Sequence, residues 1–200
     1  MRLPQNPIQG FLLGMAMGAV IGTPIAYALW KAEQPLQGSR HYRLMASPTF
    51  TQQQQKEIRG AAHKWEQAVG NKALTISVQV GACPVERGIV DGCLIPATQL
   101  IDCRPANAQA VGCASSNNGW AYTKLEIDVA CGDIHTFSHI TQHEIGHLLG
   151  IFDNNIKGTV MYHAADCGEI QSAASQDVSQ SDVEQYWRIH VLLDNPMERR

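Results

Sequence analysis

Residues 143–153 of this 200-residue chain read His-Glu-Ile-Gly-His-Leu-Leu-Gly-Ile-Phe-Asp, and this stretch predicts both a helix and a metal site. Residues four apart lie on one face of a helix, so His143 and His147 can both reach a single Zn²⁺. Glu144 follows the first histidine and can act as general base toward a water on the metal. The alternative is a core helix whose histidines are hydrogen-bonded and metal-free.

Two histidines do not complete such a site, because a catalytic zinc usually has three protein ligands and one open position. Gly150 can adopt the left-handed conformation that ends a helix and turns the chain back. Asp153, three residues later, can then supply an oxygen ligand to the same ion. His163 remains an alternative third ligand. His135 and His139 precede the motif at the same four-residue spacing, and we expect them to lie outside the site.

The flanking residues predict one mixed α/β domain. Capping pairs, Thr51 with Gln54 and Ser179 with Asp182, mark the starts of two further helices. Apolar residues at helical spacing follow Thr51 as far as Gly70, whereas strict alternation over 74–80 predicts a strand. We expect strands at 42–45, 74–80 and 124–129, helices at 51–70 and 133–149, and a closing helix after 179. Residues 81–119 are rich in Gly, Cys and Asn, which indicates long loops with short strands.

The six cysteines all follow the apolar N-terminal segment, and an even number in an exported domain favours disulfides. Fifteen pairings are possible for six cysteines. We favour local closure within 83–113, together with a bond between Cys131 and Cys167. A second zinc site built from cysteines is disfavoured because the chain has no Cys-x-x-Cys pair.

The N-terminus predicts export. Arg2 is followed by an apolar run over 11–30, which contains the small-x-small sequence Ala26-Tyr27-Ala28. We interpret 1–30 as a signal peptide or an uncleaved signal anchor, 31–40 as a linker and 41–200 as the catalytic domain. In a retained span, the glycines at 14, 18 and 22 would favour helix packing, so a membrane-embedded scaffold is a further hypothesis. The net charge of −3 argues against nucleic-acid binding, and membrane contact is expected only through 11–30.

The pattern His-Glu-x-x-His-x-x-Gly-x-x-Asp resembles the signature of the metzincin metallopeptidases, in a variant with aspartate as the third ligand. Met161 and Tyr162 resemble the methionine-containing turn of the matrixin branch. This resemblance implies a twisted, mostly parallel sheet with one antiparallel edge strand, which we expect within 122–129, a metal-binding helix and a C-terminal helix. It also implies that Met161 packs beneath the zinc ligands and that an extended peptide pairs with the edge strand.

The function implied is that of a zinc metalloendopeptidase acting on polypeptides, secreted or held in the periplasm or at the cell surface. For Tyr162 three roles stay open: it lines the pocket, it donates a hydrogen bond to the oxyanion, or it is a buried tyrosine of the turn. Glu169 lies at a distance that resembles the glutamate ligand of thermolysin-like enzymes, but Gly150 and Met161 would then be coincidences. The alternative function is an exported zinc-binding interaction or adhesion module that keeps the fold without turnover.

Overall fold

The computed structural model describes residues 39–97, 111–115, 122–164, 166–173 and 177–194. The elements run in the order β1 (Arg40–Ala46), α3 (Gln52–Val69), β2 (Leu74–Val80), β3 (Gly92–Ala97), β4 (Gly112–Ser115), β5 (Thr123–Asp128), α4 (Ile134–Leu148), α5 (Cys167–Ala173) and α6 (Gln180–Asp194). The predicted signal or anchor segment and nearly all of the predicted linker lie outside the described residues. None of the helices in the described ranges is long and apolar enough to cross a bilayer.

The strands form one five-stranded sheet in the order β2-β1-β3-β5-β4. The β1–β2, β1–β3 and β3–β5 pairs are parallel, whereas β4 runs antiparallel to β5. The predicted fold class, a mostly parallel sheet with one antiparallel edge strand, is confirmed. The predicted position of that edge strand within 122–129 is wrong, because β5 occupies those residues and lies inside the sheet, with β4 outside it.

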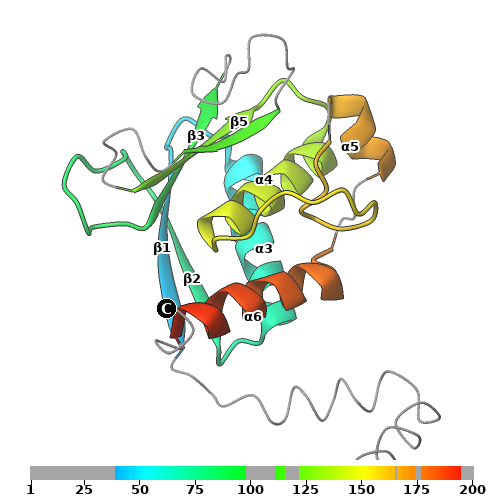
Figure 1. Cartoon of the computed structure of the whole chain (residues 1–200). Helices are drawn as coiled ribbons and strands as arrows, with labels where there is room; N and C mark the ends of the chain where they lie inside the picture. The colour runs from blue at the N-terminus through cyan, green and yellow to red at the C-terminus, as the bar shows by residue number, and fades with distance from the viewer. Residues whose placement is uncertain (1–38, 98–110, 116–121, 165, 174–176, 195–200) are drawn as a thin grey trace, which may run out of the picture. The chain divides into compact units, whose positions relative to one another are not determined.

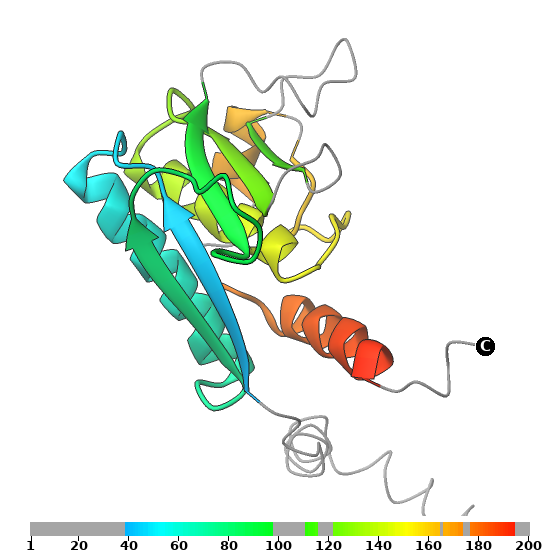
Figure 2. The ribbon, with the colours of Figure 1, turned by 90° about the vertical axis from the view of Figure 1, so that its left-hand side faces the viewer.

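The long helices α3 and α4 pack side by side against the same face of the sheet (Figures 1 and 2). The Thr51–Gln54 capping box starts α3 as predicted, with both of its reciprocal hydrogen bonds present. The fully buried Trp65 donates its indole N–H to the Gln142 carbonyl over 2.8 Å, which ties α3 to α4. This bond fixes the helix carrying the histidine motif relative to the sheet.

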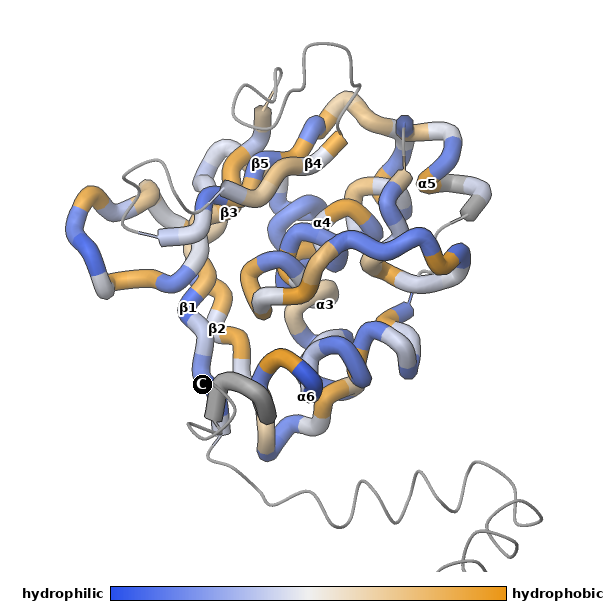
Figure 3. Tube along the Cα trace, in the orientation of Figure 1, coloured by the Kyte–Doolittle hydropathy of each residue, from blue (hydrophilic) through white to orange (hydrophobic). Residues whose placement is uncertain are grey.

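Burial follows the hydropathy of the elements. Apolar and polar stretches alternate along α6 (Figure 3), as expected for a helix with one buried face. On β5, Leu125 and Ile127 are fully buried, and Glu126 between them is buried too. Glu126 tolerates burial because the Lys124 ammonium lies 2.8 Å from its carboxylate. Burial therefore does not alternate between apolar and polar residues along this inner strand, which forms within the predicted 124–129.

The segment predicted as long loops with short strands contains two short strands, β3 and β4, of which β3 lies at the centre of the sheet. Gly92 lets β3 approach α4, because a Cβ there would lie 2.8 Å from a Leu148 methyl group. Two disulfides, Cys83–Cys93 and Cys131–Cys167, are among the pairings favoured from the sequence. Cys113 is also disulfide-bonded, whereas position 103 lies outside the described ranges.

Candidate metal centre

Helix α4 carries the histidine motif, and both of its ends are fixed by local hydrogen bonds. At the start, the Asp133 carboxylate accepts hydrogen bonds from two N–H groups of the first turn. At the end, the Gly150 N–H donates to His147 O at 2.9 Å and the Ile151 N–H donates to Gly146 O at 3.0 Å. Gly150 has a φ of 84°, so this is the Schellman ending that its sequence position predicts. The chain then turns back toward the histidines.

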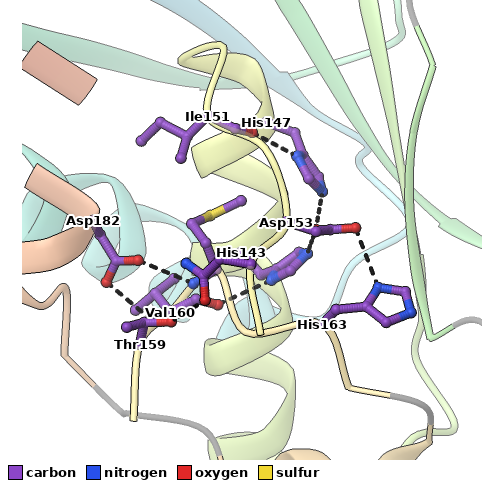
Figure 4. Close-up of polar contacts among 10 residues, drawn as sticks. His143, His147, Ile151, Asp153, Thr159, Val160, His163 and Asp182 are labelled. Atoms are coloured by element: carbon purple, nitrogen blue, oxygen red, sulfur yellow. Dashed lines mark hydrogen bonds and ion pairs between the residues drawn. The ribbon is translucent and has the colours of Figure 1, made fainter. Parts of the chain in front are cut away.

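The two imidazoles are oriented by backbone carbonyls. Nδ1 of His143 lies 2.9 Å from the Val160 oxygen, and Nδ1 of His147 lies 2.9 Å from the Ile151 oxygen. Because a carbonyl oxygen only accepts, each Nδ1 must carry the proton of its bond. The Nε2 atoms of both rings therefore face the space between the helix and the returning chain (Figure 4).

Asp153 occupies that space. Its Oδ1 lies 3.0 Å from His143 Nε2 and 3.2 Å from His147 Nε2. Burial of the His147 ring opposes its protonation, but the hydrogen bond to Asp153 and the charge of Glu144 outweigh this and raise the pKa of His147 to about 9. Burial likewise opposes ionisation of Asp153, yet the bonds from the two histidines hold the pKa of its carboxyl well below the usual range.

Glu144 lies beneath the imidazoles with only 2% of its surface exposed. Its Oε1 packs against the backbone of β4, where a Cβ on Gly112 would overlap it. Its Oε2 is buried and has no hydrogen-bond partner among the residues that the structure describes. Burial raises the pKa of the Glu144 carboxyl, although the neighbouring His143 and His147 partly offset this effect.

These groups fit a zinc ion. One atom each of His143, Glu144 and His147 lies within 4.8 Å of the others. Ligands of a tetrahedral zinc with bonds of about 2.0–2.1 Å are about 3.3 Å apart, close to the two distances from Asp153 Oδ1. Without a cation, the contacts of the two Nε2 atoms with Asp153 are hydrogen bonds, and each needs a proton on its Nε2 atom. A zinc ion bound between these atoms would take the place of both protons. The donor set of two imidazoles and a carboxylate is one that zinc accepts.

Met161 packs directly under the helix turn between the histidines. A Cβ on Gly146 would overlap the Met161 sulfur and come within 3.1 Å of the Trp65 ring. The Val160 and Met161 N–H groups donate to the two carboxylate oxygens of Asp182, at 3.0 and 3.2 Å. Asp182 is fully buried at the start of α6 and also accepts from Ser179, its predicted capping partner.

Sequence reasoning did not connect α6 to the site. The Asp182 carboxylate accepts a hydrogen bond from the Val160 N–H, and the Val160 carbonyl in turn orients His143 (Figure 4). The sequence shows the capping pair of Ser179 and Asp182, but it does not show that Asp182 also binds a turn 22 residues earlier in the chain. Asp182 is therefore a supporting residue of the site that only the structure locates.

A cavity of about 580 Å³ opens beside the histidines and runs along residues 111–114 of β4 and its approach. Tyr162 lines it, but its hydroxyl donates to Glu169 Oε1 over 2.6 Å, so its one proton is engaged there rather than aimed at an oxyanion. Glu169, the alternative ligand, lies on α5 against this hydroxyl.

His139, which we expected outside the site, is buried and lines the cavity. His163 also lines it, with its Nδ1 3.2 Å from Asp153 Oδ2.

No family model and no curated protein matches the chain. Among solved structures, the chain is similar to archaemetzincin from Methanopyrus kandleri, solved by crystallography at 1.5 Å. The two share 11% identity, the alignment covers 78% of this chain and 97% of that one, and the TM-score is 0.49.

Proposed function

We propose that this chain is a zinc-dependent endopeptidase that hydrolyses peptide bonds in proteins. The observation that carries the proposal is the convergence of two imidazole Nε2 atoms and Asp153 Oδ1 on one point, next to the buried carboxylate of Glu144. An arrangement that served only packing would not need a carboxylate oxygen left without a partner beside two oriented imidazoles. In this proposal the histidine motif is the aspartate variant of the metzincin site, and Met161 with Tyr162 forms its matrixin-like turn.

In this proposal His143, His147 and Asp153 hold the ion. Zinc, when bound, would polarise the carbonyl of the scissile bond and acidify water. The Val160 and Ile151 carbonyls keep the Nε2 lone pairs of both histidines directed at the site, as outer hydrogen-bond partners of ligands usually do. Met161 supports the same helix turn from below and is not itself a ligand.

Glu144 is the proposed general base. Its unpartnered Oε2 would accept a proton from the water whose oxygen forms the new bond to the carbonyl carbon. The same oxygen would then pass this proton to the departing amine nitrogen as the carbon–nitrogen bond breaks. Burial raises the pKa of the Glu144 carboxyl, which makes this carboxylate a better proton acceptor than an exposed one.

The substrate in this proposal is an extended polypeptide. Among the strands that the structure describes, β4 lies at one end of the sheet, and in this proposal the peptide backbone aligns with it. Val111, Gly112, Cys113 and Ala114 line the cavity together with the histidines, so a peptide aligned with β4 would lie next to Glu144. Phe152 also lines the cavity, with 76% of its surface exposed, and can contact an apolar side chain of the substrate.

We also propose that the enzyme works outside the cytoplasm, as a secreted, periplasmic or membrane-anchored protein. Three observations support this: the disulfides Cys83–Cys93 and Cys131–Cys167, the further bonded Cys113, and the apolar segment 11–30. Segment 1–30 would direct export or anchor the chain, 31–40 would link it, and 41–200 would form the catalytic domain. Sequencing the N-terminus of the exported protein distinguishes a cleaved signal, with Leu29 first, from a retained anchor.

The test is cleavage of a mixed unfolded-protein substrate by the full chain, with and without a zinc chelator. Glu144→Ala is compared with Glu86→Ala, which removes an exposed carboxylate on the β2–β3 loop. We expect cleavage to stop on chelation, to return with Zn²⁺, and to be absent from Glu144→Ala alone. Zinc binding by an inert wild-type chain would instead support the interaction or adhesion module. A disulfide-bonded chain that holds no zinc would refute both.

A further inference from the structure

The two oxygens of the Asp153 carboxylate have different partners. Oδ1 faces His143 and His147, whereas Oδ2 lies 3.2 Å from Nδ1 of His163 (Figure 4). Asp153 is the most exposed of the three proposed ligands, with 42% of its side chain accessible, compared with 17% and 20% for the histidines. Without a partner on Oδ2, this short and half-exposed carboxylate could rotate about its Cβ–Cγ bond. The contact with His163 restrains that rotation in the proposed ligand that packing holds least.

The position of His163 is set by the backbone. The Asn154 N–H donates to Met161 O and the His163 N–H donates to Asn154 O, both over 2.8 Å. These bonds align the residue after Asp153 with the chain that leaves Met161, and Asn154 and Tyr162 form an isolated parallel bridge. The Asn154 side chain in turn accepts hydrogen bonds from the Ile156 N–H and the Thr159 hydroxyl. The His163–Asp153 contact therefore joins two segments that are already held in register.

This contact contributes little to the stability of the fold. The His163 side chain is 66% exposed, and exposed pairs of this kind add little to stability. The effect of this contact on the site is larger, because removal of a hydrogen-bond partner of a metal ligand weakens metal binding about 10–100-fold. A neutral imidazole with its proton on Nδ1 is sufficient to donate this bond, so its role does not depend on the ring becoming charged.

We infer that His163 is a positioning residue, which occupies Oδ2 of Asp153 so that Oδ1 alone faces the two imidazoles. The inference rests on the proposed zinc site and deepens it. A carboxylate that offered both oxygens to the ion would take up the open position that a catalytic zinc keeps for water or substrate. A histidine as third ligand would offer the ion one nitrogen on a rigid ring. With aspartate in that position, His163 ensures instead that only one oxygen faces the ion.

The experiment uses the full chain with its disulfides intact and compares three variants. His163→Leu removes the donor and keeps an apolar bulk. His163→Asn keeps an N–H donor near the place of Nδ1. His63→Leu is the matched control, since His63 is exposed on α3 and its hydrogen-bond partners among the described residues lie on the same helix. Zinc dissociation constants are measured by competition with a chromophoric chelator, and the visible absorption of the Co²⁺-loaded proteins reports the number of donor atoms around the metal.

We expect His163→Leu to bind Zn²⁺ about 10–100-fold more weakly than wild type, with weaker Co²⁺ absorption as Asp153 adds its second oxygen. His163→Asn should restore both quantities to near wild type, and His63→Leu should leave them unchanged. An unaltered zinc affinity and Co²⁺ spectrum in His163→Leu would overturn the inference. So would equal loss of binding in both His163 variants while Asp153→Ala still binds zinc, because His163 would then be the third ligand. Failure of the wild type to bind zinc would instead refute the proposed function.

Discussion

Replacing Asp182 by asparagine tests whether α6 supports the turn beneath the histidines. The Asp182 carboxylate is fully buried and accepts hydrogen bonds from the N–H groups of Val160, Met161 and Ser179 and from the Ser179 hydroxyl. Both of its oxygens are used. Asparagine keeps the shape of the side chain but turns one acceptor oxygen into an NH₂ group, which then faces a backbone N–H.

The size of the effect follows from those bonds. A hydrogen bond to a charged group contributes about 1.5–3 kcal/mol, and a buried donor left without an acceptor costs about 1–3 kcal/mol. The bonds that asparagine can still accept offset part of this loss. We therefore expect Asp182→Asn to lower the free energy of unfolding by about 2–4 kcal/mol. Zinc affinity should fall as well, because the Val160 carbonyl orients His143.

The assay is urea unfolding of the chelator-treated protein with its disulfides intact, followed by zinc titration of the folded variant. Glu184→Gln is the control, because Glu184 lies on the same helix and, among the described residues, accepts a single 3.2 Å surface bond from Gln180. It should change stability by less than about 0.5 kcal/mol. If Asp182→Asn is as stable as this control and binds zinc as wild type does, α6 does not support the site in the way argued here.

Two further changes test the site from other directions. Gly112→Ala places a methyl group on the carboxylate of Glu144, so we expect kcat/KM to fall about 100-fold while zinc is retained. Gly60→Ala is the control and should keep full activity, because its Cβ meets only open space. Equal activities of the two variants would show that Glu144 does not need its place against β4. In the chelated protein, the His147 pKa of about 9 is higher than the unfolded value of about 6.5, so the stability that its bond to Asp153 provides is complete below pH 6.5 and is lost as pH rises through 9. The free energy of unfolding should fall by at most about 3 kcal/mol over that range, and a profile that is flat or rises in wild type, or falls equally in His147→Gln, would contradict this assignment.

The elements predicted from the sequence are those with local signals. The Thr51–Gln54 capping box, the apolar face that includes Trp65, and the left-handed Gly150 all act within about one helical turn. Their outcome depends little on the rest of the chain, and helices α3 and α4 form where these signals place them. The disulfide Cys131–Cys167 was preferred because it brackets the histidine motif.

For 81–119 the sequence predicts short strands among long loops but not where those strands lie, because their signals are not local. Strand β3 is short, contains Pro96 and is buried between two parallel neighbours, so it shows no alternation between apolar and polar residues. Strand β4 has only four residues. Parallel pairing joins segments far apart in sequence, and no local signal records which segment will be the neighbour. The edge was therefore assigned to the residues of β5, whose pattern was clear, instead of to β4.

For the site, local sequence alone dictates which residues share a helix face and where the chain turns back. Helix geometry puts His143 and His147, four residues apart, on one face, and the glycine after them ends the helix. The surroundings of these residues depend on the tertiary structure: Asp182 beneath the turn, His163 on the second oxygen of Asp153, and the β4 backbone against Glu144. These contacts connect residues from separate elements, and their distances depend on how the packed helices, turn and sheet edge meet.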